Sequence, residues 1–238
     1  MKTAVILGVG PDRGLGAQLC KRFAAEGLHV MVAGRTAESV EAVAEDICAT
    51  GGAATAVVAD ATSEDDVRAL FDQAGEDLEL AVYNAGNNTP GRIIDMEADY
   101  FENSWRVGCF GGFLFGREAV RRMVPAGGGT LLFTGASASL RGRARFGAFN
   151  SSKGALRNLA QAMAKEYGED GIHVGHVVID GPIAGDKIIK AFPEYAEKLG
   201  PEGMIGIEGI VDGFAYLYRQ PRNAWTFEVD VRTSLEKW

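Results

Sequence analysis

The chain is poor in the residues from which redox centres, metal sites and disulfides are built. Its 238 residues include only three cysteines and three histidines. Cys20, Cys48 and Cys109 are far apart, and no Cys-x-x-Cys or Cys/His spacing occurs. The sequence therefore predicts no metal site and no redox motif. Thiols in this arrangement are typical of reduced side chains in a cytoplasmic protein.

Long apolar runs and an excess of positive charge are also lacking. No run approaches the ~18 residues of a membrane span. The apolar start "MKTAVILGVG" is too short for a signal sequence and ends in a glycine turn. Lys and Arg number 24 against 32 Asp and Glu, a net charge of −8. This balance argues against binding to nucleic acid or an acidic membrane, so we expect an ordinary soluble cytosolic protein.

What the chain does contain is a regular alternation of strand and helix patterns. The short apolar runs are typical of parallel strands that are covered on both faces, and amphipathic segments between them predict helices. The expected strands are 3–9, 28–34, 53–59, 78–84, 129–135, 172–179 and 226–231, and the expected helices follow Gly14 and occupy 37–50, 63–75, 99–124, 149–167 and 207–219.

This alternation indicates consecutive βαβ units with right-handed crossovers. We therefore expect one α/β domain over residues 1–238, a Rossmann-type doubly wound parallel sheet of about seven strands flanked by helices. The less regular segment 180–208 is expected to form a substrate lid over the carboxyl edge of the sheet.

A glycine-rich turn links the first strand to the first helix. Gly10, Gly14 and Gly16 form the pattern Gly-x-x-x-Gly-x-Gly in "GVGPDRGLG". Glycines let a backbone approach a pyrophosphate closely, and the helix start supplies free N–H groups and a positive dipole end. Between a first strand and a first helix, this pattern predicts a dinucleotide site.

The end of the second strand indicates which dinucleotide is bound. Proteins that use NAD usually carry an acidic residue there, but this chain has Gly34 and Arg35. Arg13 lies within the glycine-rich turn as well. Because guanidinium groups match phosphate oxygens, two arginines near the adenosine ribose favour NADP(H) over NAD(H).

Further residues follow the later strands: Asp60 comes after the third, Asn84-Ala85-Gly86 after the fourth, and Lys153 lies in a later helix. Together with the glycine-rich turn, they make the chain resemble the short-chain dehydrogenase/reductase superfamily. The resemblance implies homodimers or homotetramers that pair through helices 99–124 and 149–167. It also implies a set of cofactor-binding residues. The pyrophosphate and ribose would be lined by Gly10, Arg13, Gly14, Leu15 and Gly16, and the adenine would be held by Asp60 and Ala61. The underside of the cofactor would contact Asn84, Ala85 and Gly86, and the nicotinamide ribose would bind Lys153.

The chain departs from this family in its proton relay. Family members carry Tyr-x-x-x-Lys, whereas "FNSSK" places Phe149 four residues before Lys153. The family's Ser falls by count on Ala136, with Ser137 adjacent, and the family's Asn falls on Gly108. The resemblance thus implies a divergent member that lacks the catalytic Tyr, with Lys153 and Ser137 as its remaining catalytic candidates.

The loss of a phenol restricts the chemistry that is expected. Ketone reduction forms an alkoxide and needs a proton donor, and losing general-acid help costs roughly a hundred- to ten-thousand-fold in rate. Reduction of a polarised C=C forms a weaker base that hydrogen bonds can stabilise, and reduction of an iminium needs no proton. We expect an NADP-dependent oxidoreductase acting on such a C=C or C=N group, or on a carbonyl with a relocated donor.

Ser137, Asp180 and His176 are the candidates for a relocated donor, although His176, inside an apolar strand, fits a core histidine better. The alternative function is a non-catalytic NADPH-binding sensor or partner subunit that has lost the relay. The substrate, the bond reduced and the proton donor stay open.

The segment "SLRGRARF" and its surroundings suggest the substrate contacts. This segment contains Arg141, Arg143 and Arg145. Three cations in a loop beside the substrate could select a carboxylate, a phosphate or a coenzyme A thioester. The alternative is a loop whose arginines only face solvent. Phe149 supplies an apolar wall, and Asp180 follows the sixth strand. The expected substrate-binding residues are therefore Phe149, Arg141 and Asp180.

Overall fold

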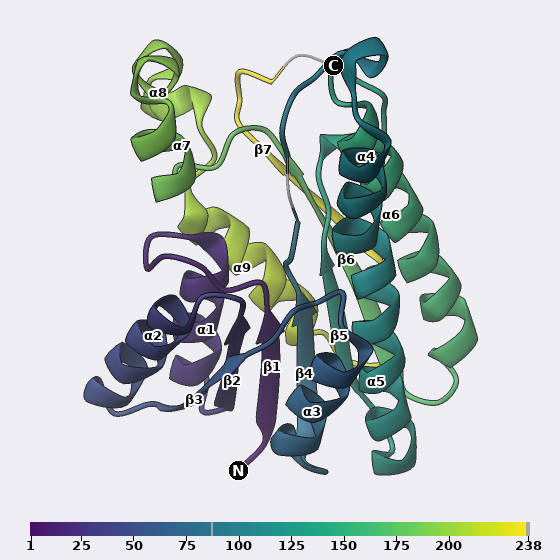
Figure 1. Cartoon of the computed structure of the whole chain (residues 1–238). Coiled ribbons are helices and arrows are strands. Elements are labelled where there is room, and N and C mark those ends of the chain that lie inside the picture. The colour runs from purple at the N-terminus through teal and green to yellow at the C-terminus, as the bar shows by residue number, and fades with distance from the viewer. Residues whose placement is uncertain (87, 237–238) are drawn as a thin grey trace.

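The computed structural model describes residues 1–86 and 88–236, which form a single α/β domain around one sheet (Figure 1). The sheet has seven strands in the order β3-β2-β1-β4-β5-β6-β7, and neighbouring strands pair in parallel. The predicted doubly wound sheet is confirmed. Its strands are β1 (Thr3–Leu7), β2 (His29–Gly34), β3 (Ala53–Val58), β4 (Leu78–Tyr83), β5 (Gly129–Thr134), β6 (Ile172–Asp180) and β7 (Glu228–Arg232).

Helices cover both faces of the sheet because both faces are apolar. Along β1, Ala4 and Ile6 join one buried cluster while Val5 and Leu7 join the other, as strand alternation requires. Figure 1 shows α1, α2 and α9 on one side of the strands and α5 and α6 on the other. The first layer is α1 (Leu15–Ala25), α2 (Ala37–Ala49) and α9 (Ile207–Tyr218), and the second is α3 (Glu64–Ala74), α5 (Gly111–Ala126) and α6 (Gly147–Tyr167).

The strand order reverses between β1 and β4, and this switch point fixes where a ligand would bind. In open α/β sheets, ligands bind in the crevice outside the carboxyl ends of the two strands concerned. The glycine-rich turn follows β1 and Asn84 follows β4, and the Asn84 side-chain amide donates a hydrogen bond of 3.0 Å to the Gly8 carbonyl. The fold thus brings the predicted cofactor segments together.

The segment predicted as one helix over 99–124 has an irregular middle. It consists of α4 (Ala98–Trp105), a π-helical turn η2 (Arg106–Phe110) and α5. The Tyr83 hydroxyl donates a hydrogen bond of 2.5 Å to the Val107 carbonyl, which an ordinary α-helix would pair with the amide of Gly111. Insertion of a side chain into the ladder widens the turn. The absence of a side chain at Gly111 leaves room for that hydroxyl.

The predicted lid segment 180–208 consists mainly of short helices. These are α7 (Asp186–Ala191), α8 (Pro193–Leu199) and the 3-10 turn η4 (Pro201–Gly203). Figure 1 shows α7 and α8 beyond the carboxyl ends of the strands. The Asp186 amide donates a hydrogen bond of 3.1 Å to the Arg13 carbonyl, so the segment touches the glycine-rich turn. Its role as a substrate lid stays a prediction.

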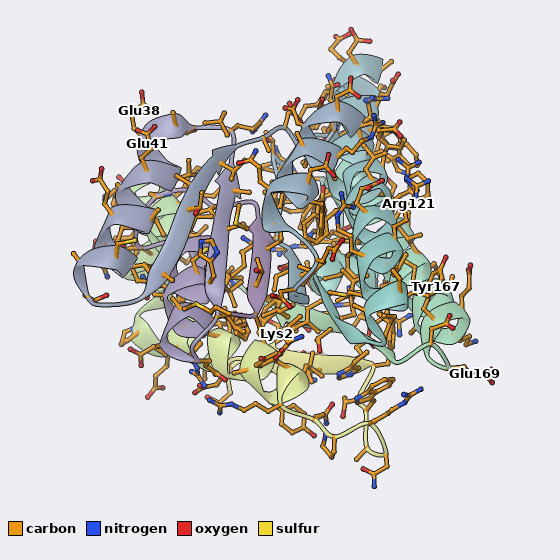
Figure 2. The ribbon with its side chains drawn as sticks, turned by 90° about the horizontal axis from the view of Figure 1, so that it is seen from below. Lys2, Glu38, Glu41, Arg121, Tyr167 and Glu169 are labelled. Carbon is orange, nitrogen blue, oxygen red and sulfur yellow. The ribbon has the colours of Figure 1, made fainter. Side chains whose placement is uncertain are left out.

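The opposite end of the molecule is seen from below in Figure 2. Lys2, which precedes β1, and Tyr167 and Glu169, near the end of α6, lie on this side, and Arg121 projects from α5. Within residues 1–86 and 88–236, no helix has both the length and the apolar character that crossing a membrane requires.

A substitution at Gly108 tests the close approach of η2 to α6. A Cβ added at Gly108 would lie 2.5 Å from the Ser152 Oγ and 2.7 Å from its Cβ. We expect Gly108→Ala to lower the free energy of unfolding by about 1–2 kcal/mol, because overpacking outweighs the gain in helix propensity. Urea unfolding measures this.

The matched control is Gly154→Ala in α6, where an added Cβ meets nothing within 4 Å. This variant should be as stable as the wild type or more so. Equal stabilities of the two alanine variants would contradict the close packing of η2 on α6.

Candidate functional site

The glycine-rich turn forms an open cradle at the start of α1. A Cβ added at Gly10 would meet nothing within 4 Å, so the backbone there is accessible to a ligand. At Gly16, by contrast, a Cβ would lie 2.6 Å from the Gly8 carbonyl, which is why helix and strand pack so closely. The start of α1 at Leu15 has no side-chain cap, because Gly14 is the N-cap residue. Uncapped N–H groups beside an open backbone fit a pyrophosphate.

The charges around the expected adenosine end come from Arg35, Arg13 and Asp60. One Asp60 carboxylate oxygen accepts hydrogen bonds of 2.8 Å from both the amide and the hydroxyl of Thr62. Burial raises the pKa of Asp60, but these hydrogen bonds and the charges of Arg35 and Arg106 outweigh it, so the pKa lies below its ordinary value. The Arg13 side chain is 66% exposed, and its Nε lies 3.9 Å from the Asp186 carboxylate.

Lys153 is buried beside the carboxyl end of β5. Its Nζ donates a hydrogen bond of 2.7 Å to the Thr134 carbonyl at the end of β5. A Cβ added at Gly86 would lie 3.5 Å from this Nζ, so the two predicted cofactor residues are neighbours. Burial lowers the pKa of Lys153 to about 8. The ammonium is thus mostly charged at neutral pH while lying among poorly solvated groups.

A chain of hydrogen bonds connects this lysine to the glycine-rich turn. The Thr134 hydroxyl donates to the Asn84 side-chain oxygen at 3.0 Å, and the Asn84 amide donates to the Gly8 carbonyl. The ends of β1, β4 and β5 are therefore fixed to one another and, through Thr134, to Lys153 of α6.

Two of the residues predicted to act on the substrate, Phe149 and Ser137, lie on α6 and on the turn that follows β5. Phe149 lies one helical turn before Lys153 in α6 and is half-buried. Ser137 begins the 3-10 turn η3 (Ser137–Ser139) that follows β5, and it is half-buried too. Since neighbouring positions on a helix face are four residues apart, Phe149 and Lys153 share one face of α6.

Arg141 and Asp180, which the sequence suggested as separate substrate contacts, bind each other. Two Arg141 nitrogens donate to the two Asp180 oxygens at 2.8 and 2.9 Å, and the Asp180 side chain is 2% exposed. Glu236, near the end of the chain, accepts a further hydrogen bond of 3.3 Å from Arg141. A paired guanidinium and carboxylate largely neutralise each other, so their role toward substrate stays a proposal.

Sequence reasoning missed a partly buried polar network around His176. His176 is fully buried on β6, and its Nδ1 lies 2.9 Å from a Glu228 oxygen on β7. Its Nε2 lies 3.4 Å from the Ser139 Oγ in η3. Ser139 and Glu228 were not recognised in the sequence because Ser137 matched the expected count better and Glu228 is 52 residues from His176.

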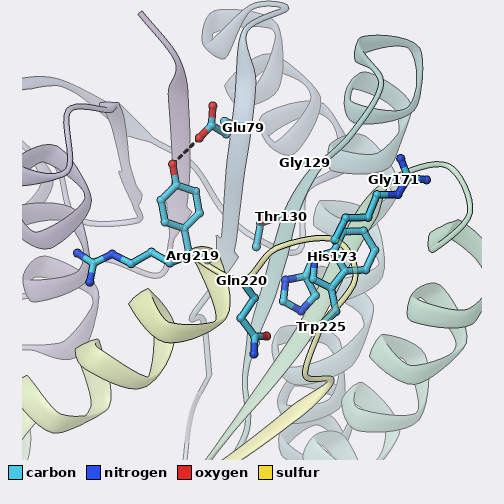
Figure 3. Close-up of a pocket in the computed structure, with 10 residues that line it drawn as sticks. Glu79, Gly129, Thr130, Gly171, His173, Arg219, Gln220 and Trp225 are labelled. Carbon is cyan, nitrogen blue, oxygen red and sulfur yellow. Dashed lines mark hydrogen bonds between the residues drawn. The ribbon is translucent and has the colours of Figure 1, made fainter.

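A cavity of about 400 Å³ lies at the other edge of the sheet, near the amino ends of the strands (Figure 3). In it, the His173 and Trp225 rings stack with centroids 4.9 Å apart. None of the predicted site residues lies there. It is lined by Glu79, Gly129, Thr130, Gly171, His173, Tyr218, Arg219, Gln220, Arg222 and Trp225.

A metal site was not expected from the sequence. Among the described residues, no group of three His, Cys, Asp or Glu side chains is arranged to hold a metal ion.

Comparison with known proteins establishes the class to which this fold and crevice belong. A family model described as short chain dehydrogenase matches residues 2–187, and the chain belongs to this family. A versicolorin reductase of Emericella nidulans is 31% identical over 234 residues, which cover 97% of this chain and 85% of that protein. The uncharacterized oxidoreductase YuxG of Bacillus subtilis is 35% identical over 190 residues, and the chain spans only 28% of its length.

Solved structures agree with this assignment. A short-chain dehydrogenase from Rhodopseudomonas palustris has a TM-score of 0.83 at 35% identity, over 97% of this chain and 98% of that chain. A 7α-hydroxysteroid dehydrogenase in complex with NADH and 7-oxoglycochenodeoxycholic acid has a TM-score of 0.88 at 27% identity, over 98% and 93% of the two chains. These similarities support a general NAD(P)-dependent oxidoreductase.

Replacement of Lys153 tests the cost of its burial. The folded pKa of about 8 lies below the ordinary 10.5, so between these values the unfolded chain holds a proton that the folded chain lacks. Stability therefore rises with pH across this window, and below pH 8 the buried charge is a net cost. We expect Lys153→Met to raise the free energy of unfolding at pH 7 by about 1–3 kcal/mol and to remove this rise. Urea unfolding between pH 7 and 10.5 measures both effects.

The control is Lys165→Met on an exposed position of the same helix, which should change stability by less than about 0.5 kcal/mol. A destabilised Lys153→Met variant would show that the hydrogen bond to Thr134 outweighs desolvation.

Proposed function

We propose that the chain is an atypical NADP(H)-dependent oxidoreductase that transfers hydride to a small organic substrate without the family's phenol. The observation that carries this is Phe149 one turn before the buried Lys153. A side chain with no exchangeable proton stands where proton donation is expected. The substrate class is a polarised C=C or C=N group, or a carbonyl served by a relocated donor.

The cofactor proposal rests on the cradle and on the two arginines. The pyrophosphate fits the open backbone at Gly10 and the uncapped start of α1. Arg13 and Arg35 favour a 2′-phosphate, since Arg35 and not an acidic residue follows Gly34 in the sequence at the end of β2. Asp60 and Ala61 would hold the adenine, and Asn84, Ala85, Gly86 and Lys153 the nicotinamide half. NADPH, when bound, supplies the hydride.

Lys153 and Ser137 are the proposed catalytic residues. The Lys153 ammonium has three N–H groups, and the hydrogen bond to Thr134 uses one of them. The others are available to the ribose hydroxyls and to negative charge that develops on the substrate. The positive charge alone stabilises an enolate, which is a weaker base than an alkoxide.

The substrate is proposed to bind between Phe149, the Arg141–Asp180 pair and the lid. The lid presents two large apolar side chains, Phe192 at 56% and Tyr195 at 43% exposure, which a bound substrate can cover. This surface suits a small, partly apolar substrate.

We also propose a cytoplasmic homodimer or homotetramer that pairs through α4, α5 and α6. Phe101, Trp105 and Phe113 on α4 and α5 are 38–42% exposed, an unusual cluster of aromatic side chains for a free surface.

The proposed preference for NADPH is tested by titrating the protein with NADPH and with NADH and measuring tryptophan fluorescence. We expect Arg35→Ala to weaken NADPH binding by about 10–100-fold, because a charge-assisted hydrogen bond is lost, and to leave NADH binding unchanged. Arg121→Ala on α5, at the far end of the molecule, is the control and should affect neither dinucleotide (Figure 2). Failure of both dinucleotides to bind the wild type would refute the proposed function.

Turnover of enones, enoyl thioesters, imines and ketones by the wild type and Phe149→Tyr tests the chemistry. We expect the variant to lose about 10-fold in rate on the native substrate, because a hydroxyl must be desolvated in an apolar wall. Tyr216→Phe on α9, at an exposed position away from the crevice, should leave the rate unchanged. A gain of about 100-fold in ketone reduction by Phe149→Tyr would show that the relay has simply been lost.

A non-catalytic NADPH-binding sensor or partner subunit is the second candidate. The pairing of Arg141 with Asp180 favours it, because two groups suited to holding a substrate are already satisfied. NADPH binding without turnover of any of the four substrate classes would support it.

A further inference from the structure

We propose that His176 is a positioning residue, which joins Ser139 and Glu228 in a partly buried network that fixes η3 and α6 relative to each other. These two segments carry Ser137 and Lys153, so the inference rests on the proposed function and deepens it. The family resemblance gave no reason to expect a histidine in this role.

The network begins at the loop that follows β5. The Ala136 amide donates a hydrogen bond of 3.1 Å to the Ser139 Oγ, and this oxygen lies 3.4 Å from the His176 Nε2. Ser139 is 8% exposed and His176 is not exposed at all. The imidazole therefore contacts, through one hydroxyl, the backbone immediately before Ser137.

The network ends on α6. The His176 Nδ1 lies 2.9 Å from a Glu228 oxygen, and Arg157 donates to both Glu228 oxygens at 2.5 and 2.9 Å. Arg157 follows Lys153 by one helical turn. Four segments, η3, β6, β7 and α6, are thus connected by side chains that lie far apart in the sequence.

The donors and acceptors define one protonation state. Two arginine N–H groups and the imidazole favour the ionised form of Glu228, and its pKa lies below the ordinary value although burial raises it. An ionised carboxylate only accepts, so Nδ1 donates to it and Nε2 of the neutral ring accepts the Ser139 hydroxyl proton. Burial, together with the nearby charges of Lys153 and Arg157, lowers the pKa of His176 to about 4, although Glu228 opposes this shift.

Gly135 makes room for the imidazole. A Cβ at this position would overlap the His176 Nε2 and would lie 3.0 Å from the Val177 carbonyl. The end of β5 therefore lies directly against the ring, and only glycine permits this approach. The same backbone continues through Ala136 into η3.

Ser139→Ala removes the contact between the network and η3 together with the hydrogen bond from the Ala136 amide, and it leaves the His176–Glu228 pair intact. We expect amide hydrogen exchange over residues 136–141 to rise at least 10-fold. We expect kcat on the substrate found by screening to fall at least 10-fold, with the Kd for NADPH unchanged. His176→Leu should have both effects more strongly, and His176→Gln, whose carboxamide oxygen can accept from Ser139, should restore part of kcat.

Ser151→Ala in α6 is the matched control, because its hydroxyl donates a hydrogen bond to the Ala148 carbonyl of its own helix. It should change neither exchange nor kcat. Faster exchange in Ser139→Ala with unchanged kcat would mean that the network is merely structural, and unchanged exchange would also overturn the proposal. If the wild type binds NADPH and reduces nothing, the proposed function fails, and the exchange data alone then decide whether the network fixes η3.

Discussion

The burial of the Lys153 ammonium against the Thr134 carbonyl is the interaction on which the crevice depends. A charge removed from water must be compensated by hydrogen bonds, and this one obtains its compensation from the end of β5. Through Thr134 and Asn84 the same hydrogen-bonded chain reaches Gly8 at the end of β1. The charged group and the glycine-rich turn are thereby fixed in one frame, although more than a hundred residues separate them. The depressed pKa of the lysine indicates that this arrangement is costly to the fold.

Much of the fold could be predicted from the sequence because its strands are buried on both faces. Runs such as 28–34 are almost continuously apolar, a pattern that few other structures produce. The π-helical turn at residues 106–110 could not be predicted. It depends on the Tyr83 hydroxyl reaching the Val107 carbonyl from a strand that lies 24 residues earlier. Side-chain insertion from a distant element leaves no local periodicity to detect.

The candidate site also has a part that the sequence could predict and a part that it could not. The candidates Gly10, Gly14, Gly16 and Lys153 could be predicted, because the three glycines lie close together in one turn and the lysine lies in one expected helix. The pairing of Arg141 with Asp180, 39 residues apart, could not be found, because each residue alone suits a substrate contact. The link from His176 to Glu228 was hidden for the same reason, although Gly135 was a signal. A glycine at a strand end often marks a close approach by another group, and here that group is the imidazole.

The proposed chemistry follows from two side chains of the crevice. Lys153 supplies an ammonium, and Phe149, one helical turn before it on α6, supplies an apolar ring and no proton donor. A cation stabilises negative charge on an oxygen or a thioester enolate without giving up its own proton, whereas a neutral phenol acts by transferring one. The retained charge therefore suits a product that is a weak base. A buried, neutral His176 fits this arrangement, since a second cation beside Lys153 would repel it and favour loss of the ammonium proton. The polar network thus helps to preserve the one charge from which the proposed chemistry proceeds.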